Sequence, residues 1–135
     1  MQPKLDLIGI VVENMAKALA FYRAVGLDIP AEADSEGHVE ITLDNGLRMA
    51  WDTYDIIRSF DDNWQPPTGH QQIGLAFLCD SPEMVDATWQ KLIDLGYESN
   101  NDPFDAYWGQ RYAQVKDPDG NVVDFFADKN TEESS

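Results

Sequence analysis

Residues 116–125, with the sequence KDPDGNVVDF, decide the fold of this chain. The stretch DPDGN at 117–121 predicts a tight turn, because these residue types supply the backbone angles and local hydrogen bonds of turns. The alternating residues at 111–115 and the apolar run at 122–126 predict the two strands of a hairpin around that turn. One carboxylate, Asp124, interrupts the apolar run.

Outward from this hairpin, the chain shows two similar halves. In the second half an apolar strand at 72–79 precedes a helix, which begins after the N-cap Ser81 and ends near Gly96. The first half has the same order of strand, amphipathic helix and hairpin, at residues 5–12, 15–25, 38–43 and 47–51. Asn45-Gly46 predicts a type I′ turn in that first hairpin. We therefore expect an internal repeat with a period of about 65 to 75 residues.

The repeat predicts one domain over residues 1–135 that is built from two modules. Module one covers about 5–55 and module two about 72–128, and a linker with two prolines joins them at about 56–71. The polar residues at about 129–135 predict a disordered tail.

The composition narrows the classes of function. The 135 residues include 25 acidic and 9 basic side chains, which gives a net charge of −16. This charge argues against nucleic acid and anionic membranes as partners, because both require concentrated positive charge. There is no long apolar run and no apolar N-terminal segment, so we expect a cytoplasmic protein without a membrane span.

Cysteine and histidine are scarce. The one cysteine, Cys79, cannot form an intrachain disulfide, and its place in the strand predicts a small buried hydrophobe. The two histidines, His38 and His70, are too few for a three-histidine metal site within one chain. Surface or capping roles, or a single catalytic base, stay open for them.

Three segments together resemble the vicinal oxygen chelate superfamily, which includes glyoxalase I, extradiol dioxygenases and bleomycin-resistance proteins. They are the first strand at 5–12, the first helix at 16–22 and the closing hairpin at 108–125. The resemblance implies an α+β fold of paired βαβββ modules. Each module would form a curled mixed or antiparallel half-barrel sheet around a cavity, with the two helices packed outside. It also implies a homodimer.

The resemblance further implies where a metal would bind. Metal enzymes of the superfamily place ligands at the positions of Leu7, Ala50, Gly74 and Asp124 in this sequence. The family pattern has His or Gln, Glu, His and Glu there, so only Asp124 carries a donor group. One carboxylate would hold a divalent ion weakly. We therefore expect a metal-free member of the superfamily, with no cofactor.

Strand periodicity separates two faces of each sheet, because side chains alternate along a strand. The face that carries the four family positions also holds small residues such as Gly9 and Ala76, and we expect it to line a cavity. The opposite face is uniformly apolar and suits packing under the helices. Its members are Ile8, Ile10, Val12, Leu47, Met49, Trp51, Leu75, Phe77, Val123 and Phe125.

Asp124 is the first candidate for ligand binding, because a buried carboxylate needs a partner. Arg48 lies on the equivalent strand of the first module and is the candidate partner. A structural ion pair between them, or an Asp124 at an exposed strand edge, would account for the same pattern without a ligand.

Four aromatic residues are the other candidates for ligand binding. Phe104 and Trp108 lie in an expected loop at 104–109, and Tyr54 and Trp64 flank the linker. Aromatic rings on loops can cover a planar or cationic ligand, and they can equally pack against the core or a dimer partner.

Three functions are consistent with these patterns. The first is a homodimeric binding protein that sequesters a small organic molecule, cationic or aromatic, as bleomycin-resistance relatives do. The second is a divergent glyoxalase-type lyase or dioxygenase that recruits a metal through Asp124 with His70 or a residue of a partner chain. The third is an interaction domain without a small ligand.

Overall fold

The computed structural model describes residues 2–129 of the chain. It divides into two compact units, Met1–Thr68 and Gly69–Ser135. The boundary between them falls inside the linker that the sequence predicts. The tail expected from about residue 129 lies, beyond Lys129, outside the described residues.

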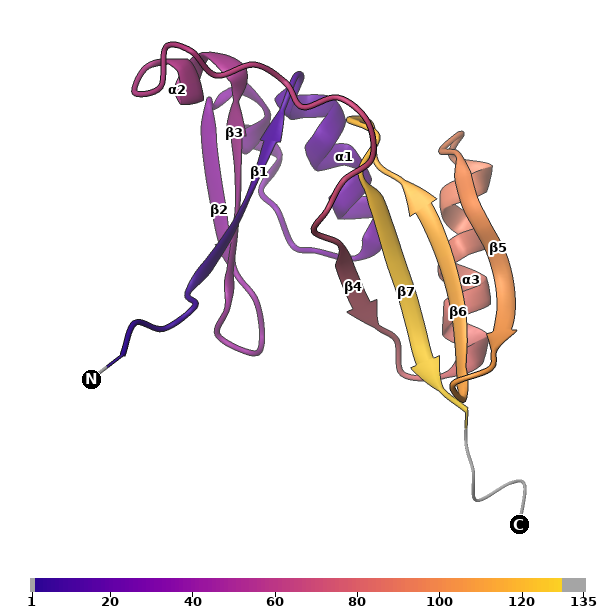
Figure 1. Cartoon of the computed structure of the whole chain (residues 1–135). Helices are drawn as coiled ribbons and strands as arrows, with labels where there is room; N and C mark the ends of the chain where they lie inside the picture. Colours follow the sequence, from indigo (N-terminus) through magenta and orange to yellow (C-terminus); the bar gives the residue numbers. More distant parts are fainter. Residues whose placement is uncertain (1, 130–135) are drawn as a thin grey trace. The chain divides into compact units, whose positions relative to one another are not determined.

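The first unit is built on a three-stranded sheet with the order β1-β3-β2 (Figure 1). Its elements are β1 (Leu7–Val12), α1 (Met15–Val25), the 3₁₀ helix η1 (Ala31–Ser35), β2 (His38–Thr42), β3 (Arg48–Thr53) and α2 (Tyr54–Arg58). Strand β1 runs parallel to β3, and β2 runs antiparallel to it. The short helix α2 extends into the segment for which the sequence predicts no regular structure.

Local capping sets the bounds of α1 where the sequence predicts them. The Asn14 side chain accepts a hydrogen bond from the backbone N–H of Lys17 at 3.0 Å and so caps the first turn. Gly26 ends the helix with a φ of 126°, a conformation that L side chains rarely adopt.

The core of the first unit lies between α1 and the apolar face of the sheet. Val12, Trp51 and Tyr22 are fully buried, and the rings of Tyr22 and Trp51 lie 5.5 Å apart between centroids. This outcome confirms the apolar face that strand periodicity predicts there. Ala50, expected to line a cavity, is buried as well, because β3 is the central strand and is flanked by β1 and β2.

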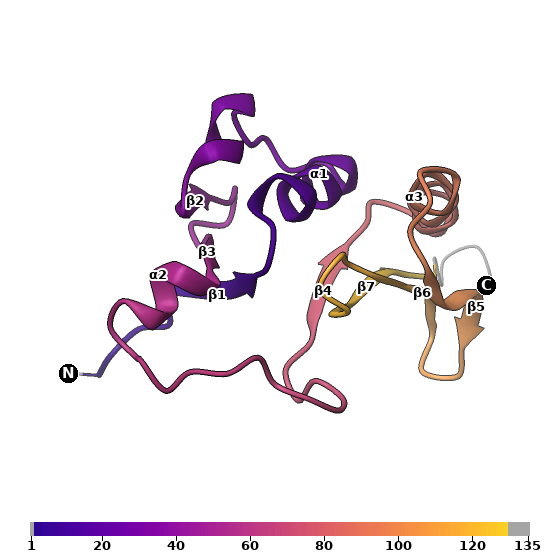
Figure 2. The ribbon, with the colours of Figure 1, turned by 90° about the horizontal axis from the view of Figure 1, so that it is seen from above.

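The second unit carries a four-stranded sheet with the order β4-β7-β6-β5 (Figures 1 and 2). Its elements are β4 (Leu75–Leu78), α3 (Pro82–Asp94), β5 (Ser99–Ala106), β6 (Gln110–Lys116) and β7 (Val122–Asp128). Strand β4 pairs parallel with β7, and the other neighbours are antiparallel. As in the first unit, the first strand pairs in parallel with the last.

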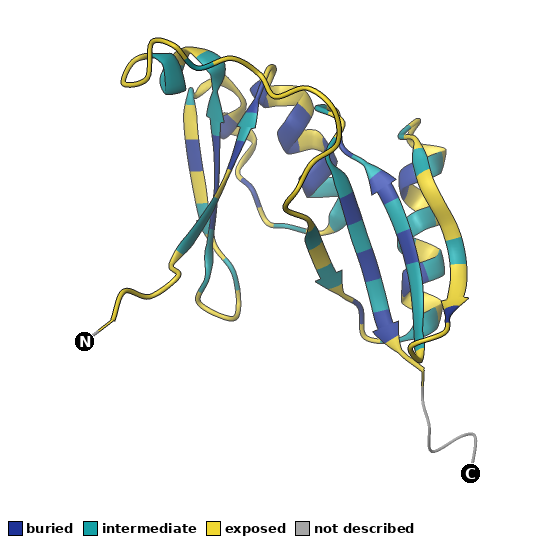
Figure 3. Ribbon diagram, in the orientation of Figure 1, coloured by how far each residue is buried: buried dark blue, intermediate teal, exposed yellow. Residues whose placement is uncertain are grey.

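Helix α3 covers one face of this second sheet (Figure 2). Along β7 the burial alternates, with Val123, Phe125 and Ala127 buried and the residues between them only half-buried (Figure 3). Cys79 is buried, as its position in the sequence predicts. The faces of the sheet therefore follow the predicted alternation, and the residues that lie away from α3 remain available for a site.

Three details differ from the sequence-based expectation. Residues 99–106 form the edge strand β5, although their polar sequence includes Pro103, because the segment pairs with β6 through two irregularities of register. Phe104 consequently lies on a strand and not in a loop. Within residues 2–129 the first sheet has three strands and only the second shows the full βαβββ order.

The turn between β2 and β3 also differs from the predicted type I′. Among residues 2–129 positive φ angles occur only at glycines, so Asn45 does not adopt the conformation that a type I′ turn requires. The Asn45 side chain instead accepts a hydrogen bond from the N–H of Leu47 at 3.0 Å, and Gly46 alone takes a positive φ of 91°. This arrangement is a longer hairpin loop with glycine in the left-handed position.

None of the helices in the described part of the chain has the length and apolar character that crossing a membrane requires.

Candidate functional site

The candidate site lies on the face of the second sheet opposite α3, which we call the site face. It is formed by half-buried side chains of β6 and β7, namely Gln110, Tyr112, Gln114, Lys116, Val122, Asp124 and Phe126. The antiparallel register places Gln114 directly opposite Asp124 and Tyr112 opposite Phe126. Hydrogen-bonding and aromatic groups therefore share one surface.

Asp124 is held by two neutral donors on the neighbouring strand. The Tyr112 hydroxyl donates to one carboxylate oxygen, and the Gln114 amide donates to the other at 2.9 Å. Two good hydrogen bonds compensate for the partial desolvation of the carboxylate. They leave its negative charge in place, because neither donor is cationic.

The environment of Tyr112 keeps its hydroxyl protonated. Desolvation, the hydrogen bond to Asp124 and the negative charge of that carboxylate together raise the pKa of Tyr112 to about 12, and desolvation is the largest of the three causes. The phenol is therefore a hydrogen-bond donor at neutral pH and does not act as a base.

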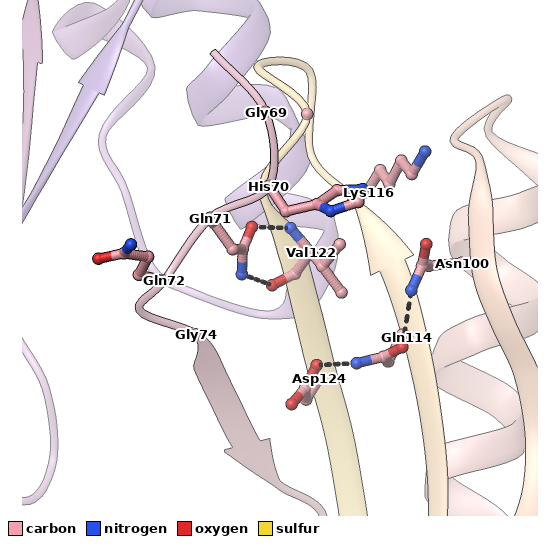
Figure 4. Close-up of a pocket in the computed structure, with 11 residues that line it drawn as sticks. Gly69, His70, Gln71, Gln72, Gly74, Asn100, Gln114, Lys116, Val122 and Asp124 are labelled. Carbon is pink, nitrogen blue, oxygen red and sulfur yellow. Dashed lines mark hydrogen bonds between the residues drawn. The ribbon is translucent and has the colours of Figure 1, made fainter. Parts of the chain in front are cut away.

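A row of amides orients Gln114. Its carbonyl oxygen accepts hydrogen bonds from the side-chain amides of Asn100 at 2.8 Å and Asn101 at 2.6 Å, which turns its own NH₂ toward Asp124. Figure 4 shows the row from Asn100 through Gln114 to Asp124. The network thus runs across three strands, from β5 to β7.

Aromatic rings surround the other side of Tyr112. Its ring centroid lies 5.9 Å from that of Phe104 and 5.5 Å from that of Trp108, and the latter contact is edge-to-face. The Trp108 indole N–H donates to the Gln110 side chain at 2.8 Å, which fixes the indole beside the face. Trp108 is 50% exposed, so much of its surface remains accessible.

A cleft of about 570 Å³ opens over one end of the site face (Figure 4). The segment at residues 69–74 forms one wall, and Gln114, Lys116 and Asp124 are among the residues on the strands beneath it. A space of this size accommodates a small organic molecule.

Three of the predicted site residues come together here, and Tyr112 connects them. Asp124 is hydrogen-bonded to the Tyr112 hydroxyl, and Phe104 and Trp108 pack against its ring. Sequence reasoning missed Tyr112 and Gln114 as site residues. The alternation of the strand at 111–115 is a partial signal, because it places both on one face of their strand, but only the register between β6 and β7 brings that face together with Asp124.

Arg48 has carboxylate partners within the first unit, and its expected pairing with Asp124, a residue of the second unit, stays a prediction. Its guanidinium donates to Asp6 at 2.6 Å and to Glu40 at 2.5 Å. Glu40 lies on β2 and Asp6 just before β1, so the two strands that flank β3 bring both carboxylates to an arginine at the start of that strand.

His38 belongs to the same group of charged side chains, because it shares Glu40 with Arg48. One imidazole nitrogen of His38 lies 2.5 Å from Asp52 and the other 2.9 Å from Glu40. The hydrogen bonds to Asp52 and then to Glu40 raise the pKa of His38 above its usual 6.5. Because both ring nitrogens are engaged, His38 is poorly placed to act as a general base.

Tyr54 and Trp64 enclose a cation of their own chain. Their ring centroids are 5.0 Å apart, and the Arg58 guanidinium lies 5.5 Å from the first ring and 5.6 Å from the second. Arg58 also donates to the backbone carbonyl of Trp64 at 3.3 Å. This cluster ties the segment after α2 to the helix, which is a structural role within the first unit.

Comparisons with known proteins place the chain in a family. The sequence profile of the glyoxalase/bleomycin resistance protein/dioxygenase superfamily matches residues 4–125. The chain belongs to this superfamily. A comparison with curated protein sequences finds no match.

Solved structures share the fold of this superfamily member. A glyoxalase-related enzyme from Fulvimarina pelagi is similar with a TM-score of 0.79 and 15% identity, covering 94% of this chain and 89% of that one. The hypothetical protein SA1046 from S. aureus has a TM-score of 0.76 and 19% identity, covering 94% of each chain. A glyoxalase/bleomycin resistance protein/dioxygenase family enzyme from Burkholderia phytofirmans PsJN has a TM-score of 0.75 and 19% identity, covering 93% and 98%.

The residues at the superfamily's metal-ligand positions do not fit a metal. Leu7, Ala50 and Gly74 offer no side-chain donor atom, so Asp124 is the one residue of the four that could supply a ligand, and a single carboxylate holds a divalent ion weakly. Within residues 2–129, no three side chains of His, Cys, Asp or Glu gather into a group that could hold a metal ion. The site face offers a ligand hydrogen bonds, a negative charge and aromatic surface.

Proposed function

We propose that this superfamily member is a metal-free binding protein that sequesters a small cationic or aromatic compound on the site face. The observation that carries the proposal is the hydrogen-bonded Asp124 carboxylate, held by Tyr112 and Gln114 beside accessible aromatic rings. The carboxylate supplies a fixed negative charge that is partly shielded from water, and such a charge attracts a cationic group more strongly than an exposed one does.

The aromatic rings add to this selectivity. The Tyr112 ring carries the hydroxyl that binds the carboxylate, and Trp108 packs edge-to-face against that ring. Cations are attracted to the faces of such rings. A planar ligand could stack on the accessible part of Trp108. A binder needs no group that activates a substrate, which is consistent with a Tyr112 hydroxyl that stays protonated.

A second candidate function is a divergent glyoxalase-type lyase or dioxygenase. The specific observation in its favour is that His70 lines the same cleft as Asp124, which gives one imidazole and one carboxylate near a common space. Further ligands would then have to come from a substrate or another chain.

Metal content separates the two candidates. We expect the purified chain to contain far less than one equivalent of Zn, Ni, Mn or Fe per subunit, measured by plasma mass spectrometry. Asp124→Ala should leave this content unchanged. One tightly held metal per subunit, lost in Asp124→Ala, would contradict the binding proposal and support the enzyme.

Ligand binding tests the proposal directly. Planar cationic compounds should raise the unfolding temperature, because a ligand that binds only the native state stabilises it. Trp108→Ala should weaken every such ligand, and Trp64→Ala serves as the matched control, since Trp64 packs around Arg58 in the first unit. If Trp108→Ala and the unchanged chain bind these ligands with equal affinity, the ligands do not contact Trp108, and the proposed position of the site is wrong.

The cellular setting is part of the same proposal. We propose a homodimer in the cytoplasm, with a small organic molecule as its partner and neither nucleic acid nor membrane bound. The net charge of −16 supports the exclusion of polyanionic partners.

A further inference from the structure

The cleft over the site face has two chemically different ends. Asp124 and Gln114 lie at one end, where a carboxylate is held by neutral donors. Lys116 and His70 line the cleft nearer the turn that joins β6 and β7 (Figure 4). A lysine ammonium and an imidazole N–H are both hydrogen-bond donors to anions.

The register of the sheet sets the distance between these ends. Gln114 faces Asp124, and Lys116 faces Val122 two residues further along each strand. Two residues of an extended strand span about 7 Å, so the backbone positions of Lys116 and Asp124 are offset along the strands by roughly the length of a small molecule.

The Lys116 ammonium can be recruited by a ligand. It lies 3.2 Å from a carboxylate oxygen of Glu98, whose side chain is 71% exposed. Exposed ion pairs of this kind are weak and screened by salt, so an anion seated in the cleft can compete with Glu98 for the ammonium.

The segment that carries His70 is held in place by the next residue, Gln71. The Gln71 side-chain amide donates to the carbonyl of Val122 at 2.9 Å and accepts from the N–H of Val122 at 2.6 Å. It satisfies both backbone groups of Val122, next to the point where the β4–β7 ladder begins at Leu75 and Val123. The segment at 69–74 is thereby fixed to the edge of β7, with His70 and Gln72 on the rim of the cleft.

We propose that the ligand of this cleft is amphoteric, with an ammonium or other donor group at Asp124 and a carboxylate at Lys116 and His70. This inference rests on the proposed binding function and specifies its ligand class. A monoanionic carboxylate fits better than a phosphate dianion, because the chain as a whole carries a charge of −16 and repels anions. At this end of the cleft Lys116 and His70 are the groups that counteract this repulsion.

The probes for this inference are four benzene derivatives that differ only in their charged ends. They are 4-(aminomethyl)benzoate, its methyl ester, benzoate and benzylamine. Binding to the full chain is followed by ¹H–¹⁵N correlation spectra in titrations to millimolar concentration. We expect 4-(aminomethyl)benzoate to bind about tenfold more tightly than its ester, because the ester loses one charge-assisted hydrogen bond.

Substitutions at Lys116 test whether the tighter binding of the acid depends on the end of the cleft that Lys116 lines. Lys116→Gln should remove the advantage of the acid over the ester without changing the affinity of the ester, and Lys116→Arg should retain it. Lys91→Gln is the matched control, since Lys91 is an exposed lysine on α3 and lies on the other side of the sheet. It should change neither affinity.

The outcomes separate this inference from the proposed function. If the ester binds as tightly as the acid, and Trp108→Ala weakens both, the binding function stands and the amphoteric ligand is overturned. If Lys116→Gln weakens acid and ester equally, the carboxylate does not lie at Lys116 and the inference is overturned. If none of the four probes binds, the amphoteric ligand is overturned, and the binding function is judged by the planar cationic compounds alone.

Discussion

Tyr112 contacts three of the groups that make up the site face. Its hydroxyl bonds Asp124, and its ring packs against Phe104 and Trp108. One side chain therefore positions both the charge and the aromatic surface. Removing the hydroxyl would leave one carboxylate oxygen without its donor while the ring contacts persist.

We expect Tyr112→Phe to lower the free energy of unfolding by about 1 to 3 kcal/mol, the usual cost of a lost hydrogen bond to a partly buried charge. It should also weaken cationic ligands, because the carboxylate is no longer fixed. Urea denaturation and thermal shift measure the two effects. Tyr107→Phe is the control, since Tyr107 is 96% exposed. Equal stability of the two variants would show that the hydroxyl contributes nothing.

His38 gives the first unit a predictable dependence on pH. Hydrogen bonds to Asp52 and Glu40 raise the folded-state pKa of His38 above the usual 6.5. A raised folded-state pKa means that the stabilisation is fully present below the unfolded-state pKa and is lost as pH rises through the folded-state pKa. The chain should therefore lose stability as the pH rises above 6.5 and through the folded-state pKa of His38.

His38→Asn should flatten this part of the stability profile, as followed by urea denaturation at a series of pH values. His70→Asn, which removes the other histidine from the second unit, is the control and should retain the slope. A slope that survives in His38→Asn would assign the effect to another group.

At the scale of the element, capping explains why both long helices begin where the sequence predicts. Ser81 precedes α3, and its hydroxyl accepts from the N–H of Met84 at 3.1 Å. Pro82 follows at the first helical position, where its fixed φ suits the first turn. Helix α3 in turn covers the buried side of the sheet whose other side is the site face.

Ser81→Ala should lower the free energy of unfolding by about 1 kcal/mol, because it removes the acceptor for an N–H of the first turn. Ser81→Asp keeps an acceptor at this position and should lose little. Amide hydrogen exchange at the start of α3 measures the effect locally. Unchanged exchange in Ser81→Ala would contradict the role of the cap.

Sequence reasoning succeeds where local chemistry decides an element and fails where distant pairing does. Asn14 and Gly26 set the ends of α1, and both can be found by inspection. Strand β5 cannot, because its polar residues form a strand only through pairing with β6. The same holds for the site. The position of Asp124 follows from strand alternation, but its partners Tyr112 and Gln114 depend on the register between β6 and β7.

At the scale of the whole molecule, charge opposes self-association while exposed apolar side chains favour it. Each chain carries a net charge of −16, and two chains repel one another at low ionic strength. Phe60, Ile73 and Leu78 are large apolar residues that are mostly exposed in the single chain. Burial of such residues is a driving force for the proposed homodimer.

We expect the purified chain to sediment as a dimer, and the dimer fraction to rise with sodium chloride concentration because salt screens the repulsion. Sedimentation velocity at low and at physiological ionic strength measures this fraction. Sucrose in place of salt is the control for nonspecific crowding. A monomer at every salt concentration would overturn the proposed homodimer.

The four tryptophans of this chain lie in four different environments. Trp51 is fully buried, Trp64 packs against Arg58, and the indole N–H of Trp89 bonds Ser99 at 2.9 Å. Trp108 alone among them belongs to the aromatic group beside Asp124. The emission of Trp108 can therefore be isolated as the difference between the fluorescence spectra of the chain and of its Trp108→Phe variant. That difference reports whether water or a bound molecule contacts the aromatic surface, and it requires no attached dye.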